Sequence, residues 1–188
     1  MCVGIVNYRR NGNADSSRLH REHRFYRKYA NWVANQLKCD LFRLEDVSID
    51  DLKQYPLVVY GGWVKGGIIQ GLDELRGKVR GKYIVFAVGA LPKRGGDAVG
   101  FRKKNGLEDV PTFYFEGGLR WYRLTEGQKA ALLMYKETLQ MFDYHKLSSN
   151  EKFFLNNIGR TFDHSSLDGV KELTDFLESE RGQKLTAD

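Results

Sequence analysis

The stretch LVVYGGWVKGG, residues 57–67, decides the fold. Its first four residues, 57–60, are apolar or aromatic and follow Pro56, as in a strand buried on both faces of a parallel sheet. Two glycines come next, and glycine permits turns and close approaches of the backbone. We therefore expect a buried strand over 57–60 that ends at Gly61 and Gly62, followed by a glycine-rich loop around Trp63.

Segments of the same kind recur on both sides of this stretch. Residues 2–8, 41–44, 83–88 and 112–115 are predicted to form further short apolar strands. Helical periodicity or capping residues predict helices over 26–38, 68–76, about 125–142, a short helix from 148, and about 167–180. Strands that alternate with helices are typical of an α/β protein, in which a parallel sheet lies between two layers of helices.

Length and composition favour a single domain over residues 1–188. Of the 188 residues, 41% are hydrophobic and 29% charged, a balance that excludes a disordered protein. The two cysteines, Cys2 and Cys39, form no CxxC pair, which favours a reducing, cytoplasmic setting over a disulfide framework. The start of the chain is too quickly charged for a signal peptide, and no apolar run is long enough to span a membrane.

Three loops are candidates for a ligand site. Open parallel sheets bind ligands beyond the carboxyl ends of their strands, which here means the loops after Tyr8, Tyr60 and Val88. In the second loop the glycines let a flat ligand approach the backbone, and Trp63 can stack on a ligand ring. A glycine turn with Trp63 folded onto the core is equally compatible with the sequence. After Val88, small residues either expose backbone N–H groups to a ligand or simply let the chain turn.

The loop after Tyr8 has the composition of a phosphate site. Asn11, Gly12 and Asn13, with serines at 16 and 17, precede the next helix, and Arg10 adds positive charge. A solvated polar loop explains the same residues, and from composition alone that interpretation is the stronger one.

The order of these features resembles the flavodoxin family, and more narrowly its branch of menaquinone-dependent protoporphyrinogen oxidases. The resemblance is carried by KYANWVANQL (28–37), SIDDLKQYPLVVYGGWVKGGIIQGL (48–72), YIVFAVGALP (83–92), DVPTFYFEGGLRWYRL (109–124) and GRTFDHSSLDGVKELTDFL (159–177). It implies a flavodoxin-like three-layer sandwich whose five-stranded parallel sheet has the order 2-1-3-4-5, with FMN bound across the strand ends. The family's ring-contacting loops correspond to Gly61–Gly67 and Val88–Pro92, with Trp63 as the stacking residue and Trp121 bordering the same crevice.

The phosphate loop departs from the family pattern. Gly12-Asn13-Ala14 is the nearest match to the family's Gly-Asn-Thr turn, so one hydroxyl is missing, and about a dozen residues intervene before the matching helix. Basic residues can replace that hydroxyl. The resemblance implies no catalytic side chain and no metal ligand. The cofactor-binding residues it implies are Arg10, Asn11, Gly12, Asn13, Gly61, Gly62, Trp63, Val64, Val88, Gly89, Ala90 and Trp121.

The segment 9–28 is strongly basic. It holds seven Lys or Arg residues against two acidic ones, nearly the whole excess behind the chain's net charge of +6. The basic insert at about 14–25 is a candidate docking patch for an acidic redox partner or an anionic membrane surface, although a solvated helix face is the favoured interpretation. No nucleic-acid partner is expected, because few aromatics are interleaved and no reader motif is present. His20 and His23 lack the further ligands of a metal site.

Two functions are compatible with the sequence. In the first, the chain is an FMN-binding electron-transfer protein or a small flavin oxidoreductase, with a redox partner protein or a quinone or porphyrinogen as substrate. A substrate pocket would then be built from loop 93–106 and segment 117–124. In the second, the chain is a flavodoxin-fold binding or regulatory module that has lost FMN, a hypothesis motivated by the altered phosphate loop. No nucleophile elbow or P-loop motif supports a hydrolase or a nucleoside triphosphatase.

Overall fold

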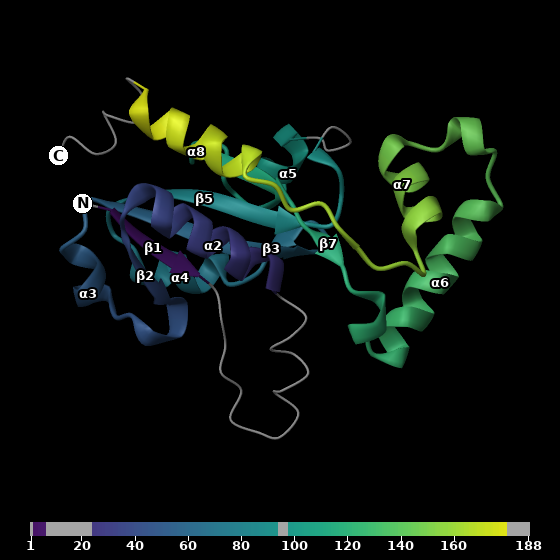
Figure 1. The fold of residues 1–188 in the computed structure, drawn as a ribbon, viewed down its shortest axis with the longest axis horizontal. Helices are drawn as coiled ribbons and strands as arrows, with labels where there is room; N and C mark the ends of the chain where they lie inside the picture. Colours follow the sequence, from purple (N-terminus) through teal and green to yellow (C-terminus); the bar gives the residue numbers. More distant parts are fainter. Residues whose placement is uncertain (1, 7–23, 94–97, 180–188) are drawn as a thin grey trace.

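The computed structural model describes residues 2–6, 24–93 and 98–179 of the chain. Within them, a mostly parallel sheet lies between layers of helices, as Figure 1 shows. The predicted α/β class is therefore confirmed. The predicted phosphate loop, most of the basic insert and the polar tail lie outside the described residues.

The parallel strands are β1 (Cys2–Val6), β2 (Asp40–Arg43), β3 (Leu57–Lys65), β5 (Lys82–Gly89) and β6 (Thr112–Glu116). They lie in the order β2-β1-β3-β5-β6, so the chain order reverses between β1 and β3. Numbered among themselves, the parallel strands follow the order 2-1-3-4-5. A short strand that the sequence did not predict, β4 (Ile68–Ile69), pairs antiparallel with β3 and makes the sheet six-stranded.

Strand β3 is more than twice as long as expected. It continues through Gly61 and Gly62 to Lys65, so the predicted stop at these glycines is wrong. A Cβ at Gly61 would lie 2.1 Å from Cζ of Phe86 on β5, and one at Gly62 would lie 2.6 Å from Cγ2 of Ile69. The glycines therefore make room for large neighbours on the two faces of the sheet instead of ending the strand.

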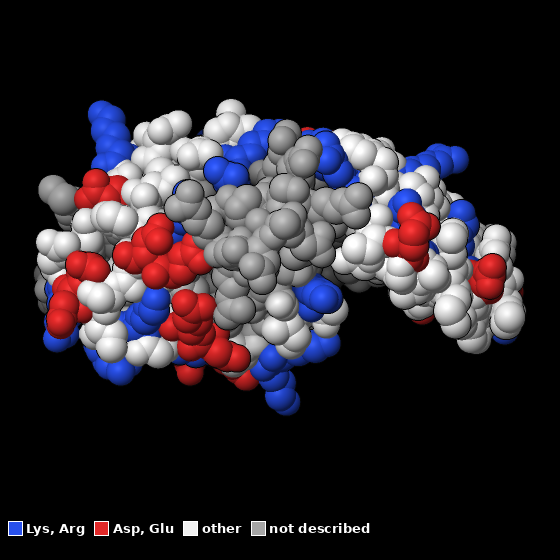
Figure 2. All heavy atoms as spheres, turned by 90° about the horizontal axis from the view of Figure 1, so that it is seen from below, with Lys and Arg blue, Asp and Glu red and all other residues white. Residues whose placement is uncertain are grey.

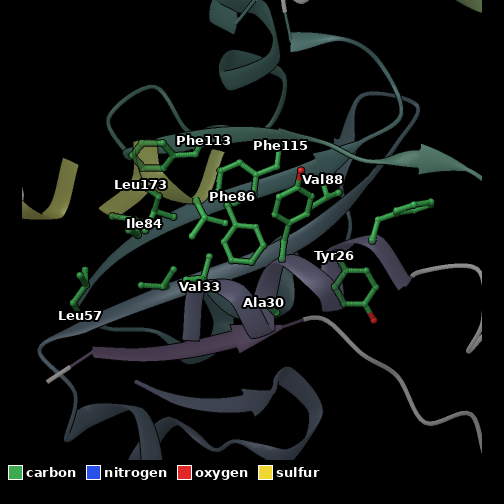
Figure 3. Close-up of a cluster of buried hydrophobic side chains, with 14 residues drawn as sticks. Tyr26, Ala30, Val33, Leu57, Ile84, Phe86, Val88, Phe113, Phe115 and Leu173 are labelled. Carbon is green, nitrogen blue, oxygen red and sulfur yellow. The ribbon is translucent and has the colours of Figure 1, made fainter. Parts of the chain in front are cut away.

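Helices fill the connections and cover both faces of the sheet. In chain order they are α2 (Arg24–Leu37), α3 (Ile49–Lys53), α4 (Leu72–Lys78), α5 (Ala98–Lys104), α6 (Glu126–Gln140), α7 (Ser149–Asn157) and α8 (Asp168–Glu178). Helices α2 and α8 pack on one face against an aromatic cluster around Tyr29, Phe86 and Phe115, part of which is labelled in Figure 3. Helices α3, α4 and α5 cover the other face, where Leu75 is fully buried.

The helix starts follow local sequence signals closely. The hydroxyls of Ser48, Thr125 and Ser148 each accept from the backbone N–H three residues on, and their own backbone N–H donates to the side chain of that residue. A capping box therefore forms at each of these three helix starts. Helix α4 differs from its prediction, because Gly71 is its N-cap with a φ of 81° and residues 68–69 form β4. Glycine takes this left-handed conformation without strain, since it has no Cβ.

Helices α6 and α7 form a lobe that projects to one side of the sheet (Figure 1). They contact each other, with the rings of Tyr135 and Phe154 edge to face at 5.6 Å. In this fully described lobe, Leu139 is the one buried residue of α6, and α7 has none. Two short strands, β7 (Gly118–Leu119) and β8 (Phe162–Asp163), pair antiparallel. They hold the segment that enters the lobe beside the segment that leaves it. No helix in the described part of the chain is long and apolar enough to cross a membrane.

Candidate functional site

A cleft lies beyond the carboxyl ends of β3, β5 and β6, close to the point where the strand order reverses. Its volume of about 400 Å³ falls within the range of small-molecule sites. The start of α2 and the segment after β6 complete its wall. The lining residues are Phe25, Tyr26, Trp63, Val64, Lys65, Gln70, Val88, Gly89, Ala90, Gly117, Gly118, Leu119, Arg120, Arg123, Leu124 and Gln128.

The β3–β4 hairpin carries one side of the cleft. Gly66 and Gly67 form its two-residue turn with φ values of 57° and 80°, the left-handed pair that such a turn favours. The buried Asn105, just after α5, clamps this hairpin from behind. Its Oδ1 accepts from the N–H of Ile69 at 2.8 Å, and its Nδ2 donates to the carbonyl oxygen of Gly67 at 2.9 Å. A residue distant in sequence thus fixes the strand that lines the cleft.

The cleft brings together several predicted site residues from two strand ends: Trp63, Val64, Val88, Gly89 and Ala90. Trp63 lines the cleft and also packs against the aromatic core, as one interpretation of the sequence predicted, whereas stacking of Trp63 on a ligand ring stays a prediction. Its carbonyl oxygen accepts from the N–H of Gln70 at 2.9 Å. A Cβ at Gly89 would lie 2.2 Å from the hydroxyl oxygen of Tyr114, so this glycine makes room for a neighbouring ring.

The other predicted site residues lie elsewhere. Gly61 and Gly62 are buried inside β3, away from the cleft wall. Trp121 begins the 3-10 turn η3 (Trp121–Arg123), where its N–H donates to Oγ1 of Thr161 at 3.1 Å, and it does not line the cleft. Four predicted residues lie outside the described part of the chain: Arg10, Asn11, Gly12 and Asn13.

Three basic residues that the sequence analysis did not single out line the cleft: Lys65 on β3, and Arg120 and Arg123 after β7. None of the described lining residues is a carboxylate. The guanidinium carbon of Arg120 lies 5.3 Å from the centre of the Phe25 ring, and its Nη1 donates to the hydroxyl of Tyr122 at 3.2 Å. Its Nε is buried without a hydrogen-bond partner among the described residues.

The basic residues of this wall change the pKa values of neighbouring side chains. Hydrogen bonds from Arg120 and Arg123 lower the pKa of the exposed Tyr122. Burial acts to raise the pKa of Asp163, but hydrogen bonds from the following loop and the charges of Lys28 and Arg120 outweigh it, so this pKa is lowered. Asp163 therefore stays ionised outside the cleft, where it pairs with Lys28 at 3.7 Å.

A second cavity of about 420 Å³ shares Val64 with the first. Residues 91–93 after β5 contribute to it together with Phe101 and Tyr114, whose rings stand edge to face at 5.9 Å. Residues of both segments predicted to build a pocket, 93–106 and 117–124, do line cavities, although different ones. Among the described residues, no group of three or more His, Cys, Asp or Glu side chains is placed to hold a metal ion.

The fold and the cleft define a class: an α/β protein with a mostly parallel sheet and a cationic, partly aromatic cleft at the strand ends. No family model and no curated protein matches the chain. Among solved structures, a flavodoxin from the domain Archaea matches 61% of this chain and 78% of its own, at 15% identity and a TM-score of 0.36. The flavodiiron protein from Giardia intestinalis matches 61% of this chain and 30% of its own, at 14% identity and a TM-score of 0.32. The description of the fold as an α/β protein with a mostly parallel sheet rests on the strand order and the helix layers, not on these likenesses.

Proposed function

We propose that the chain is a flavodoxin-like FMN-binding protein that transfers electrons, to a partner protein or to a small quinone- or porphyrinogen-type substrate. One observation carries the proposal: a single cleft joins the ring of Trp63 to the charges of Arg120 and Arg123, without a carboxylate among its described lining residues. FMN combines a flat aromatic ring with a phosphate, so each wall of the cleft has a counterpart in it.

The aromatic side fits a flat ring. Trp63 offers a face for stacking, worth about 0.5–1.5 kcal/mol beyond the area buried. Ala90 carries little side chain, so a ring can approach the backbone just after the end of β5. Val64 and Val88 line the same space and exclude water from it.

The cationic side fits a phosphate. A charge-assisted hydrogen bond contributes about 1.5–3 kcal/mol, and the guanidinium group of Arg120, which lines the cleft, is a donor of this kind. Arg123 and Lys65 add positive charge at the same cleft. These basic residues can replace the phosphate-binding hydroxyl that the turn at 12–14 lacks. FMN binding is therefore compatible with the departure from the family's phosphate loop.

When bound, FMN supplies the one- and two-electron chemistry. The chain's own part is to hold the ring against Trp63, neutralise the phosphate and keep water out. The described lining holds no histidine and no carboxylate. Electron transfer therefore needs no acid or base from this part of the wall.

The test begins with an absorption spectrum of the purified protein and a titration of the stripped protein with FMN. We expect a flavin spectrum and saturable binding that weakens about tenfold in Trp63→Ala, since lost stacking and burial together cost roughly 1.4 kcal/mol or more. Trp32→Ala is the matched control, because Trp32 of α2 packs on the core and does not line the cleft. Equal affinity in both variants would contradict the site, and no flavin binding at all would favour a binding module that has lost FMN.

A further inference from the structure

Helix α6 presents an uncharged stripe that nothing in the described fold covers. The α6 stripe consists of Gly127, Ala131, Met134, Thr138 and Met141, all of them exposed. Their spacing alternates between four and three residues, the interval that keeps side chains on one seam between paired helices. Met134 is 68% exposed and Met141 83% exposed.

The stripe lies on the side of α6 that faces away from α7. Each residue turns a helix by 100°, which places the buried Leu139 and the half-buried Leu132 about 140–160° from Met134. The contact with α7 therefore uses the opposite side. In Figure 2 the lobe, at the right, shows mostly uncharged side chains on the face in view.

The two helices of the lobe bury few of their own residues, and the other buried residues of the lobe, Leu147 and Ile158, lie just before and just after α7. Helix α6 has 15 residues but buries only Leu139, while α7 buries none. Helices of about this length are marginal in water unless a packed apolar face stabilises them. Phe142, just after α6, is 62% exposed and extends the uncovered surface. A partner on the α6 stripe would supply the burial that the lobe lacks.

We propose that the α6 stripe is the interface between two copies of this chain, which pack their α6 helices antiparallel about a two-fold axis at Met134. The stripe has its smallest residue, Gly127, at one end and a large one, Met141, at the other, and this difference favours the antiparallel arrangement. In that arrangement Met141 of one copy faces Gly127 of the other, and Thr138 faces the small residues at 130–131. Large side chains then fill the space left by small ones. A parallel pair would set Met141 against itself and leave a gap at Gly127.

The charges beside the stripe favour a second copy over an anionic lipid surface. Lys129 is paired with Glu126 at 2.8 Å, and Nζ of Lys136 donates to the carbonyl oxygen of Ile158 at 3.3 Å. Glu137 adds a negative charge next to Met134. A helix that lies on an anionic membrane needs a flank of available basic residues, which α6 does not offer.

The first test is the mass of the full chain by light scattering and sedimentation over a range of concentrations. We expect a dimer. In Met134→Glu the dissociation constant of the dimer should increase at least about a hundredfold, because two carboxylates would meet on the axis away from water. Gln140→Glu is the matched control: it adds the same charge on α6 about 120° away from Met134, and the dimer should persist.

A second variant keeps the test decisive if Met134→Glu does not fold. On the two-fold axis each Met134 meets its own copy, so Met134→Cys should form a covalent dimer under mild oxidation, and Gln140→Cys should not. A chain that stays monomeric at all concentrations overturns the proposal, as does a dimer that Met134→Glu leaves intact. A monomer that sediments with anionic vesicles would show a lipid surface as the occupant and equally overturn it.

Discussion

Gly61 of β3 and Phe86 of β5 lie so close that a side chain at Gly61 would enter the Phe86 ring. A Cβ at Gly61 would be 2.1 Å from Cζ of Phe86. Phe86 stacks in turn on Phe115 of β6, with ring centres 5.1 Å apart. The absence of a side chain at one position in β3 therefore fixes the aromatic cluster that lies beneath the cleft.

Replacing Gly61 by alanine should lower the free energy of unfolding by about 1–3 kcal/mol, because the added methyl group overpacks the core. Urea denaturation measures this change. Gly77→Ala is the control: Gly77 lies on an exposed turn of α4 with no atom within 4 Å of the new Cβ, so this variant should gain about 0.5–1 kcal/mol. If both variants were equally stable, Phe86 would not be held against β3 as described.

Tyr29 ties α2 to two other parts of the chain. Its hydroxyl donates to the carbonyl oxygen of Glu116 at 2.6 Å and accepts from the N–H of Ser166 at 3.0 Å. Tyr29→Phe removes both bonds at a buried site and should cost about 1–3 kcal/mol of unfolding free energy. Hydrogen exchange at the Ser166 amide should speed up in the same variant, and unchanged exchange there would contradict the bond.

The same residue predicts an alkaline limit to stability. Burial raises the pKa of Tyr29 above its usual 10.0, and burial also raises the pKa values of Tyr60 and Tyr114. The folded chain thus holds these protons more tightly than the unfolded chain does. Their stabilising effect is complete below about pH 10 and is lost as the pH rises through the raised values. The urea concentration at the midpoint of unfolding should decrease as the pH rises above 10, and it should decrease less steeply in Tyr29→Phe.

Asn105 should matter to the cleft although it does not line it. Asn105→Asp replaces a donor that bonds two carbonyl oxygens, those of Gly67 and Phe101, with a second acceptor. We expect a loss of at least about 1–3 kcal/mol of stability and weaker flavin binding, because the β3–β4 hairpin loses its clamp. Asn31→Asp on the exposed side of α2 is the matched control and should change neither quantity.

The sequence predicted features that depend on neighbours along the chain and missed those that depend on distant ones. The capping boxes at Ser48, Thr125 and Ser148 were predictable because cap and partner are three residues apart. The length of β3 was not, because the meaning of Gly61 depends on Phe86, which lies 25 residues further on. The site residues that the family resemblance implied divide into two sets: Trp63, Val64, Val88, Gly89 and Ala90 line the described cleft, whereas Gly61, Gly62 and Trp121 do not.

The cationic wall was missed for a related reason. Arg120 and Arg123 follow the glycines after β6, so a signal was present, but basic residues at a strand end are common and usually solvated. Only the structure shows that Arg120 has a buried Nε without an acceptor in the described part of the chain.

The wall predicts a discrimination between ligands. Arg123→Gln should weaken FMN binding about tenfold, because it removes a charged partner of the phosphate, and should leave riboflavin binding unchanged. Lys129→Gln is the control for the loss of one positive charge, because Lys129 lies near the start of α6 and outside the cleft. Isothermal titration measures both ligands, and a parallel loss for FMN and riboflavin would place the phosphate elsewhere.

The most direct measurement is the ratio of the dissociation constants of riboflavin and FMN for the stripped wild-type protein, at low and at high salt. A phosphate held by Arg120 and Arg123 predicts that FMN binds at least about tenfold more tightly, and that the ratio shrinks as salt screens the charges. Equal affinities at both salt concentrations, or no binding of either ligand, would contradict a flavin site in this cleft.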